Sequence, residues 1–131
     1  MIIGIGIDIV DLGRFQKRLS QELIQELFLP GEIAYCRTQH HNEENYAARF
    51  AAKEAVFKAL GHGLEQGLRW HDVEVCKKDT GAVYLAFSGR AAELAAQKKV
   101  TNSHLSLSHS RQNAIAMVVL ENSEQSSEEI P

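Results

Sequence analysis

The stretch "IGIGIDIV", residues 3–10, decides how the N-terminal part of the chain folds. Isoleucine occupies every odd position in it, and Gly4, Gly6 and Asp8 stand between the isoleucines. Side chains of a strand alternate between its two faces, so the pattern predicts an isoleucine face and an opposite face that is bare before Asp8. Glycine weakens a strand unless a closely packed helix or a ligand needs the space. Something is therefore expected to approach this bare face closely.

Asp8 has two interpretations, because a buried carboxylate is costly unless it is paired or bound to a metal. The structural interpretation is an aspartate at a strand end that caps the next helix. Functionally, the glycines would clear room beside Asp8 for Glu54 and a divalent cation. Two carboxylates together with substrate phosphates form the ligand set that Mg²⁺ prefers. The residues alone leave both interpretations open.

Composition limits the class of protein. The 131 residues suffice for one compact domain, predicted at 1–121 and followed by an acidic, disordered tail at 122–131. Four of the 17 acidic residues lie in 121–131, so 14 basic residues stand against 13 acidic ones elsewhere, which argues against bulk nucleic-acid binding. No apolar run approaches the roughly 20 residues of a membrane helix. Cys36 and Cys76 form no C-x-x-C pair and are expected to be reduced thiols of a cytoplasmic protein without a secretory signal.

Periodicity and turn signals predict an α+β fold, in which most strand pairs are joined by short turns. Strands are expected over 1–10, 72–76, 82–87, 104–109 and 114–120. Short helices are expected over 11–19, 20–28, 29–37 and 88–98, and a long helix over 43–60, capped by Asn42 and ended by Gly61.

The long helix is the most informative of these elements. A stripe of small side chains, which lets another backbone approach, runs along one face: Ala48, Ala52, Ala55 and Ala59. Phe50, Glu54 and Lys58 lie roughly opposite at i, i+4 and i+8, with Arg49 and Lys53 beside them. Glu54 and Lys58 could form a plain surface ion pair, which stabilises a helix by only about 0.2–0.5 kcal/mol. The density of charged residues just before a Gly-His-Gly loop favours a functional site over a plain surface ion pair.

The segment "LSLSHS", residues 105–110, suggests a nucleophilic serine–histidine pair at first sight. Strand parity argues against it, because Ser106, Ser108 and Ser110 face one way and His109 the other. His109 could be a structural or merely exposed residue, or it could bind an anion.

Three segments together resemble the 4′-phosphopantetheinyl transferases: "GIGIDIVDLGRF", "RFAAKEAVFKALGHG" and "LSLSHSRQNAIAMVVLE". By its length the chain is similar to the holo-[acyl-carrier-protein] synthase branch of that family. The resemblance extends to about Glu121 and implies a mainly antiparallel sheet packed against a long helix. It also implies a homotrimer with sites between subunits.

The resemblance implies a role for each matching residue. Asp8 and Glu54 match the family's magnesium ligands, and Lys58 matches the lysine that meets the coenzyme A pyrophosphate. Arg49 and His109 match positions at the phosphate end of the nucleotide. The loop from Gly61 matches the family's phosphate loop, although His62 stands where a small or hydroxyl residue is more usual.

Arg14 matches a basic residue of the first helix that docks the acidic carrier protein. Lys17 and Arg18 would extend this docking surface, whereas without the resemblance the three bases would be read as a solvated helix face.

The implied reaction moves 4′-phosphopantetheine from coenzyme A to a serine of apo acyl carrier protein, as required for fatty acid biosynthesis, with Mg²⁺ as cofactor and adenosine 3′,5′-bisphosphate as the other product. The base that deprotonates the serine is left open between a metal-bound water and a free carboxylate such as Glu32. A Mg²⁺-dependent pyrophosphohydrolase acting on coenzyme A or a nucleotide is the alternative enzyme. A non-catalytic nucleotide-binding oligomer is the alternative outside enzymes.

Overall fold

Strands and helices are mixed along the chain in the computed structural model, which describes residues 1–124. The strands are β1 (Ile2–Asp11), β2 (Val73–Lys77), β3 (Val83–Phe87), β4 (Asn102–His109) and β5 (Asn113–Glu121). The helices are α1 (Leu12–Arg18), α2 (Gln21–Leu27), α3 (Pro30–Arg37), α4 (Asn42–Leu60) and α5 (Gly89–Gln97), with short 3₁₀ helices η1 (Leu64–Gln66) and η2 (Trp70–Asp72). The predicted α+β class is confirmed.

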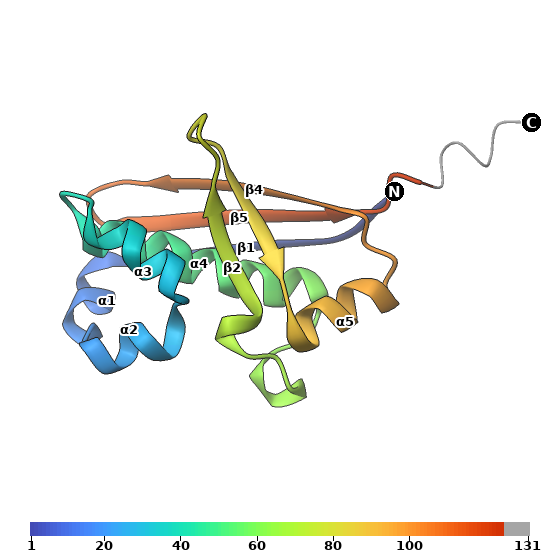
Figure 1. The fold of residues 1–131 in the computed structure, drawn as a ribbon, viewed down its shortest axis with the longest axis horizontal. Helices are drawn as coiled ribbons and strands as arrows, with labels where there is room; N and C mark the ends of the chain where they lie inside the picture. The colour runs from blue at the N-terminus through green and yellow to red at the C-terminus, as the bar shows by residue number, and fades with distance from the viewer. Residues whose placement is uncertain (125–131) are drawn as a thin grey trace, which may run out of the picture.

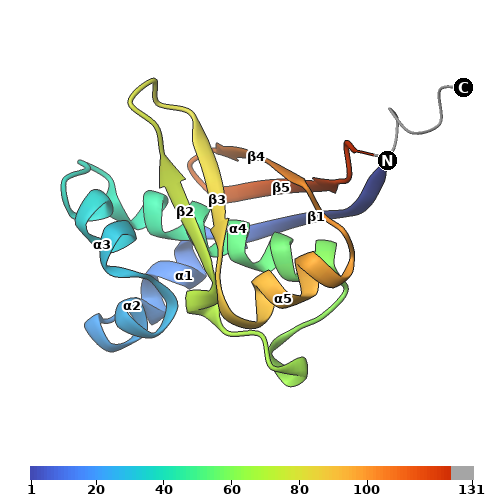
Figure 2. The same cartoon turned by 45° about the vertical axis from the view of Figure 1, so that its right-hand side comes forward.

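Two antiparallel sheets form the β structure. One has three strands in the order β1-β5-β4, and the other is the β2-β3 hairpin. Helix α4 runs along the three-stranded sheet, with α1, α2 and α3 gathered at one end and α5 at the other (Figure 1). In the turned view the β2-β3 hairpin crosses on the other side of α4, so this helix lies in the middle of the molecule (Figure 2).

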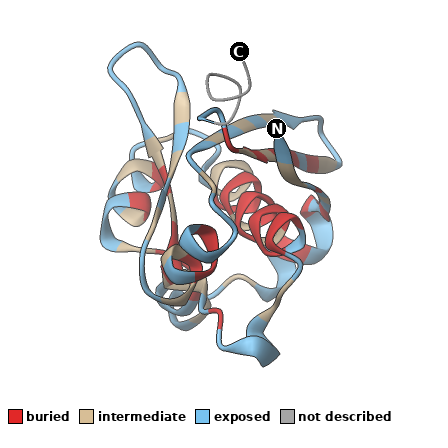
Figure 3. Cartoon of the chain, turned by 90° about the vertical axis from the view of Figure 1, so that its right-hand side faces the viewer, coloured by how far each residue is buried: buried red, intermediate tan, exposed pale blue. Residues whose placement is uncertain are grey.

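Helix α4 is the centre of the core. Most of its residues are buried, and they form the largest group of buried positions in the chain (Figure 3). Its ends differ from the prediction in one detail, because His41 is the N-cap residue and Asn42 is already helical. The predicted Asn42 cap is therefore wrong, whereas Gly61 ends the helix in a left-handed conformation with φ 72°, as the sequence suggested. The two 3₁₀ helices carry no periodic signal and were not expected.

The bare face of β1 packs on α4. A Cβ added to Gly4 would lie 2.0 Å from the carbonyl oxygen of Ala59, and one added to Gly6 would lie 1.8 Å from that of Ala55. The glycines of β1 therefore pack directly against the alanines of α4, and the two backbones are in contact. The glycines clear space for a helix, and this close contact brings Asp8 to the same side of the sheet as α4.

The opposite face of the sheet is uncovered by the described part of the chain. Ile5, Ile7 and Ile9 are 58–60% exposed. Ile7 pairs with Met117 and Ile9 with Ile115 in the antiparallel register, and these two side chains are exposed as well. A contiguous exposed apolar surface of this kind is typical of an interaction site.

The C-terminal segment is attached to the body as far as the structure describes it. The Asn122 backbone N–H donates to the Met1 carbonyl at 2.8 Å, and the buried Asn122 side chain donates to the Lys99 carbonyl. The disorder predicted for the tail falls largely on 125–131, outside the described residues. Among residues 1–124 no helix combines the length and apolarity that crossing a membrane requires.

Candidate active site

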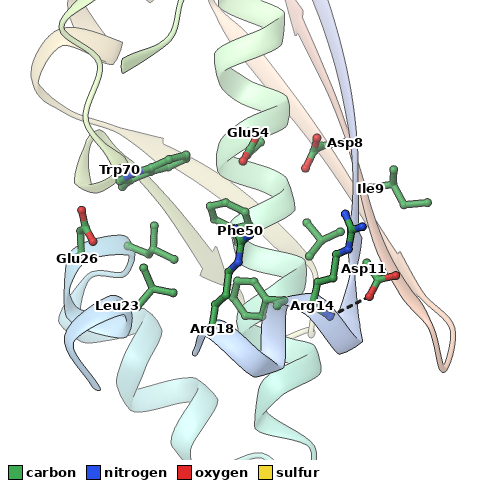
Figure 4. A pocket seen from close by; sticks show the side chains of 13 residues that line it. Asp8, Ile9, Asp11, Arg14, Arg18, Leu23, Glu26, Phe50, Glu54 and Trp70 are labelled. Atoms are coloured by element: carbon green, nitrogen blue, oxygen red, sulfur yellow. Dashed lines mark hydrogen bonds between the residues drawn. The ribbon is translucent and has the colours of Figure 1, made fainter. Parts of the chain in front are cut away.

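Asp8 and Glu54 line one pocket between β1 and α4, of about 660 Å³. Figure 4 shows the Asp8 carboxylate beside α4 and the Glu54 carboxylate on the side of α4 that faces the viewer, at about the same level. Asp8 lies two residues beyond Gly6 on the face that contacts α4, and Glu54 lies beside Ala55, the residue that Gly6 touches. The close approach of the two backbones therefore places the acids opposite each other. We call this space the main pocket.

Lys58 is bound to Asp8. Its ammonium donates to the Asp8 carboxylate at 2.9 Å and to the Ile7 carbonyl at 3.0 Å. The Asp8 side chain is only 12% exposed, whereas that of Lys58 is 54% exposed, so the lysine closes the acid off from one side while keeping contact with water. Lys58 follows Glu54 by one helical turn, which puts both on one side of α4.

Burial raises the pKa of Glu54, and the neighbouring negative charge of Asp8 raises it further, against the opposing effect of Lys58. The two carboxylates thus repel each other in a partly dry setting. A divalent cation between them would relieve this repulsion, and carboxylate oxygens are suitable ligands for it. No group of three or more metal-binding side chains occurs within residues 1–124. The remaining ligands of such a cation would have to be water and substrate oxygens, as is usual for Mg²⁺.

Aromatic and basic side chains complete the main pocket. Phe50 and Trp70 form an apolar wall, with their ring centroids 5.2 Å apart. Arg14 and Arg18 extend from α1 toward the same space (Figure 4). Of the three predicted docking residues these two border the pocket, whereas Lys17 is exposed elsewhere on α1.

A second pocket continues from the first past Glu54 and Trp70. It has a volume of about 570 Å³ and is lined by Lys58, Gly61 and His62 among others. The predicted phosphate loop therefore adjoins the paired carboxylates. The His62 ring is turned back onto the chain, with its Nδ1 2.9 Å from the Leu60 carbonyl oxygen.

Arg49 and His109 lie away from the carboxylates. They line a third pocket of about 120 Å³, which we call the Arg49 pocket, together with Tyr35, Glu44 and Lys77. The charged residues of α4 consequently do not form one cluster. Glu54 and Lys58 face the main and second pockets, and Arg49 faces the Arg49 pocket.

Lys53, the fourth charged residue of this group, is inside the core. Its ammonium donates to Glu32 at 2.8 Å and to the carbonyl oxygens of Trp70 and Val73. Glu32 is 1% exposed and also accepts from the backbone N–H groups of Leu29 and Val75. Glu32 is therefore no free carboxylate, and its suggested role as a general base is wrong.

The description "4′-phosphopantetheinyl transferase superfamily" belongs to a family model that matches residues 4–118. The chain belongs to this superfamily. The transferase is 46% identical over 124 residues to the holo-[acyl-carrier-protein] synthase of Trichlorobacter lovleyi, covering 92% of this chain and 98% of that one. It is 47% identical to that of Geobacter metallireducens, with the same coverage. The family predicted from the three motifs and the prediction of an enzyme are confirmed.

A solved structure agrees with this assignment. The holo-(acyl-carrier-protein) synthase of Bacillus anthracis in complex with coenzyme A (3′,5′-ADP) is similar to the transferase at a TM-score of 0.78 and 37% identity, over 94% of this chain and 99% of that one.

Several pocket residues were missed by sequence reasoning. Trp70 stands in a segment without periodicity, and Tyr35 and Lys77 come from elements that the sequence gave no reason to place near Arg49. Only Phe50 had a signal, since it precedes Glu54 by four residues on the same face of the helix. The roles of the predicted site residues stay predictions, and each role now belongs to residues of a particular pocket.

Proposed function

We propose that this transferase moves 4′-phosphopantetheine from coenzyme A to a serine hydroxyl of apo acyl carrier protein, with Mg²⁺, in fatty acid biosynthesis. The products would be holo carrier protein and adenosine 3′,5′-bisphosphate. The observation that carries the proposal is the pairing of Asp8 and Glu54 in the main pocket, which Arg14 and Arg18 of α1 also line, with Lys58 bound to Asp8 and lining the adjoining second pocket. The coenzyme A complex of the Bacillus anthracis relative supports the choice of donor.

Asp8 and Glu54 would hold the Mg²⁺. The raised pKa of Glu54 fits this assignment, because the Asp8 charge that raises it is the charge a cation would neutralise. When bound, Mg²⁺ supplies charge neutralisation at the pyrophosphate oxygens of the substrate.

The protein's own residues supply positioning, which dominates catalysis of phosphoryl transfer. Lys58 borders both the carboxylates and the Gly61 loop, and its half-exposed side chain would bind a phosphate oxygen in the second pocket. Phe50 and Trp70 exclude water from one wall of the main pocket, which strengthens the charge interactions inside it.

The carrier protein would dock on α1. Arg14 and Arg18 border the mouth of the main pocket, and Lys17 adds a third exposed base to the same short helix. An acidic partner would be oriented by these charges so that its serine points into the pocket, which raises the association rate more than the affinity.

Arg49 and His109 would bind the phosphate end of the nucleotide. Within one chain, Arg49 and His109 line a different pocket from Lys58. One molecule of coenzyme A would contact both pockets most simply if one copy of the chain supplied the second pocket and a neighbouring copy supplied the Arg49 pocket. The uncovered face of Ile5, Ile7 and Ile9 offers an apolar surface for such an assembly. We therefore propose a homotrimer with sites between subunits, in the cytoplasm.

Mass spectrometry of the carrier protein tests the proposal. Incubation with coenzyme A, Mg²⁺ and apo carrier protein should add the mass of phosphopantetheine to the carrier. Glu54→Ala should abolish this gain while gel filtration shows an unchanged assembly. Cleaved nucleotide without a modified carrier would indicate a pyrophosphohydrolase, and bound but intact coenzyme A would indicate a binding protein. Either result would refute the transfer.

A further inference from the structure

Lys53 of α4 is a buried cation whose hydrogen bonds reach three other elements. Its side chain is fully buried, and its ammonium donates to the Glu32 carboxylate of α3 at 2.8 Å. It also donates to the Trp70 carbonyl at 3.2 Å and to the Val73 carbonyl. An ammonium has three N–H groups to satisfy, and two of the three acceptors come from one short segment of the chain. Lys53 therefore holds that segment as well as pairing with an acid.

The two carbonyls lie at the two ends of η2. Trp70 is its first residue, and Val73 directly follows its last. The turn itself is closed by the Val73 backbone N–H, which donates to the Trp70 carbonyl. A 3₁₀ turn has poor hydrogen-bond geometry, and this one carries no periodic pattern that would fix it locally. The Lys53 ammonium supplies the missing restraint, because it joins both ends of the turn to α4.

The indole of Trp70 is the wall that the main pocket and the second pocket share. Its ring centroid lies 5.2 Å from that of Phe50 and 5.1 Å from that of Phe57, and both of these rings belong to α4. In the view of Figure 4, Trp70 lies on the other side of Glu54 from Asp8. A shift of η2 away from α4 would therefore open both pockets beside the Glu54 carboxylate.

We infer that Lys53 is a positioning residue, whose ammonium holds η2 on α4 and thereby fixes the Trp70 wall relative to Glu54. Lys53 and Glu54 are consecutive, so one turn of α4 carries both the acid and the anchor of the wall. Glu32 balances the charge of this anchor inside the core. In naming the ligand that needs the wall, the inference rests on the proposed function, which assigns both pockets to coenzyme A.

Tryptophan fluorescence tests the inference directly, because Trp70 is the only tryptophan of the chain. Lys53→Met in the full, assembled chain should move the emission maximum to longer wavelength and increase quenching by acrylamide, since a loosened indole meets more water. Calorimetry with coenzyme A and Mg²⁺, without carrier protein, should show binding weakened by about 2- to 10-fold, the order of one aromatic contact. Both measurements are made without denaturant, where circular dichroism shows that the variant is folded.

A double variant separates positioning from stability. Lys53→Met combined with Glu32→Gln leaves no unpaired acid in the core, so part of the lost stability should return. It restores no donor to the Trp70 carbonyl, so the emission and the affinity for coenzyme A should remain those of Lys53→Met. Recovery of emission and affinity together with stability would make Lys53 a merely structural residue and overturn its positioning role. Should Lys53→Met fail to fold, the double variant is compared with wild type, and wild-type emission would refute the inference.

Leu120→Ala is the control for instability as such. Leu120 is fully buried on β5 and lines none of the pockets that Trp70 lines. Truncating a buried leucine destabilises a protein about as much as breaking a buried ion pair does. Emission and affinity for coenzyme A should nevertheless stay at their wild-type values. Changes as large as those of Lys53→Met would show that any loss of stability moves Trp70, and would contradict a specific anchor.

Failure of the inference and failure of the proposed function give different results. Wild-type emission in Lys53→Met would refute the positioning role, even if the wild-type protein transfers phosphopantetheine. A wild-type protein that does not bind coenzyme A would refute the proposed function. The emission of Lys53→Met would then still decide whether Lys53 positions Trp70.

Discussion

Replacing Gly6 by alanine tests whether β1 and α4 must touch for Asp8 and Glu54 to share one pocket. The new Cβ would lie 1.8 Å from the carbonyl oxygen of Ala55 and 2.8 Å from its carbonyl carbon. Backbone atoms in the middle of a buried helix cannot turn aside as a flexible side chain can, so the strand and the helix must separate. Overpacking a core costs about 1–3 kcal/mol and occasionally more, and this clash with backbone belongs at the upper end. We expect a loss of about 3 kcal/mol in the free energy of unfolding.

The same separation should impair the reaction. A displacement of about 1 Å in a catalytic group can cost about 100-fold in rate, so transfer should fall by a factor of that order. Urea unfolding followed by circular dichroism gives the stability, at one protein concentration because assembly contributes to it. Gly13→Ala is the matched control: Gly13 is exposed on α1, and its Cβ would meet only the Asp11 carboxylate at 3.4 Å. This control should be neutral or slightly more stable.

Two results would contradict this reasoning. A Gly6→Ala protein with wild-type stability and wild-type transfer would show that strand and helix need not touch. Wild-type stability combined with a raised Mg²⁺ requirement would show that the glycine serves a cation and not the helix.

Three other substitutions test separate parts of the site. Burial and, next, the charge of Asp8 raise the pKa of Glu54, so the Glu54 carboxyl holds its proton more tightly in the folded state than in the unfolded chain. The free energy of unfolding therefore falls as the pH rises through the raised pKa. Metal-free Glu54→Gln should therefore unfold at higher urea than wild type at pH 8, with the difference vanishing in acid; a less stable variant at pH 8 would contradict this. Arg14→Glu should raise the KM for carrier protein and leave the KM for coenzyme A unchanged. Lys98→Glu, at the exposed C-cap of α5, is the charge-matched control, and equal rises in both constants would count against docking. Lys53→Met leaves the buried Glu32 without its cation and should lower the free energy of unfolding by about 3–5 kcal/mol. Adding Glu32→Gln to the same chain should recover part of this loss. A loss below about 1 kcal/mol would argue that the pair is not structural.

Local sequence patterns predicted the secondary structure well, since they report on local geometry. The isoleucine alternation marked β1, and the helical spacing of residues 43–60 marked α4. The small side chains on both elements also indicated that their backbones approach closely, which Gly6 and Ala55 do. The predicted cap, Asn42, is one residue too late, because several polar residues precede the helix and any of them can occupy the cap position that His41 takes.

The charges of α4 were harder to interpret from the sequence. Arg49, Lys53 and Glu54 are close in sequence, but a helix turns about 100° per residue, so neighbours face different surroundings. What those surroundings are depends on segments far along the chain, such as Glu32 on α3 and Tyr35 beside Lys77. No local pattern contains this information.

The sequence by itself identified the family, through its resemblance in three motifs, and predicted the strands and the α-helices, through periods of two and of 3.6 residues. It suggested the pairing of Asp8 on the first strand with Glu54 on the longest helix as one of two interpretations. Only the tertiary structure decided that Glu32 pairs with Lys53 in the core and that Arg49 is buried beside a pocket without a salt bridge to residues 1–124. The physical reason is that the protonation and pairing of a charged group depend on what desolvates it, and desolvation is a property of packing between distant segments.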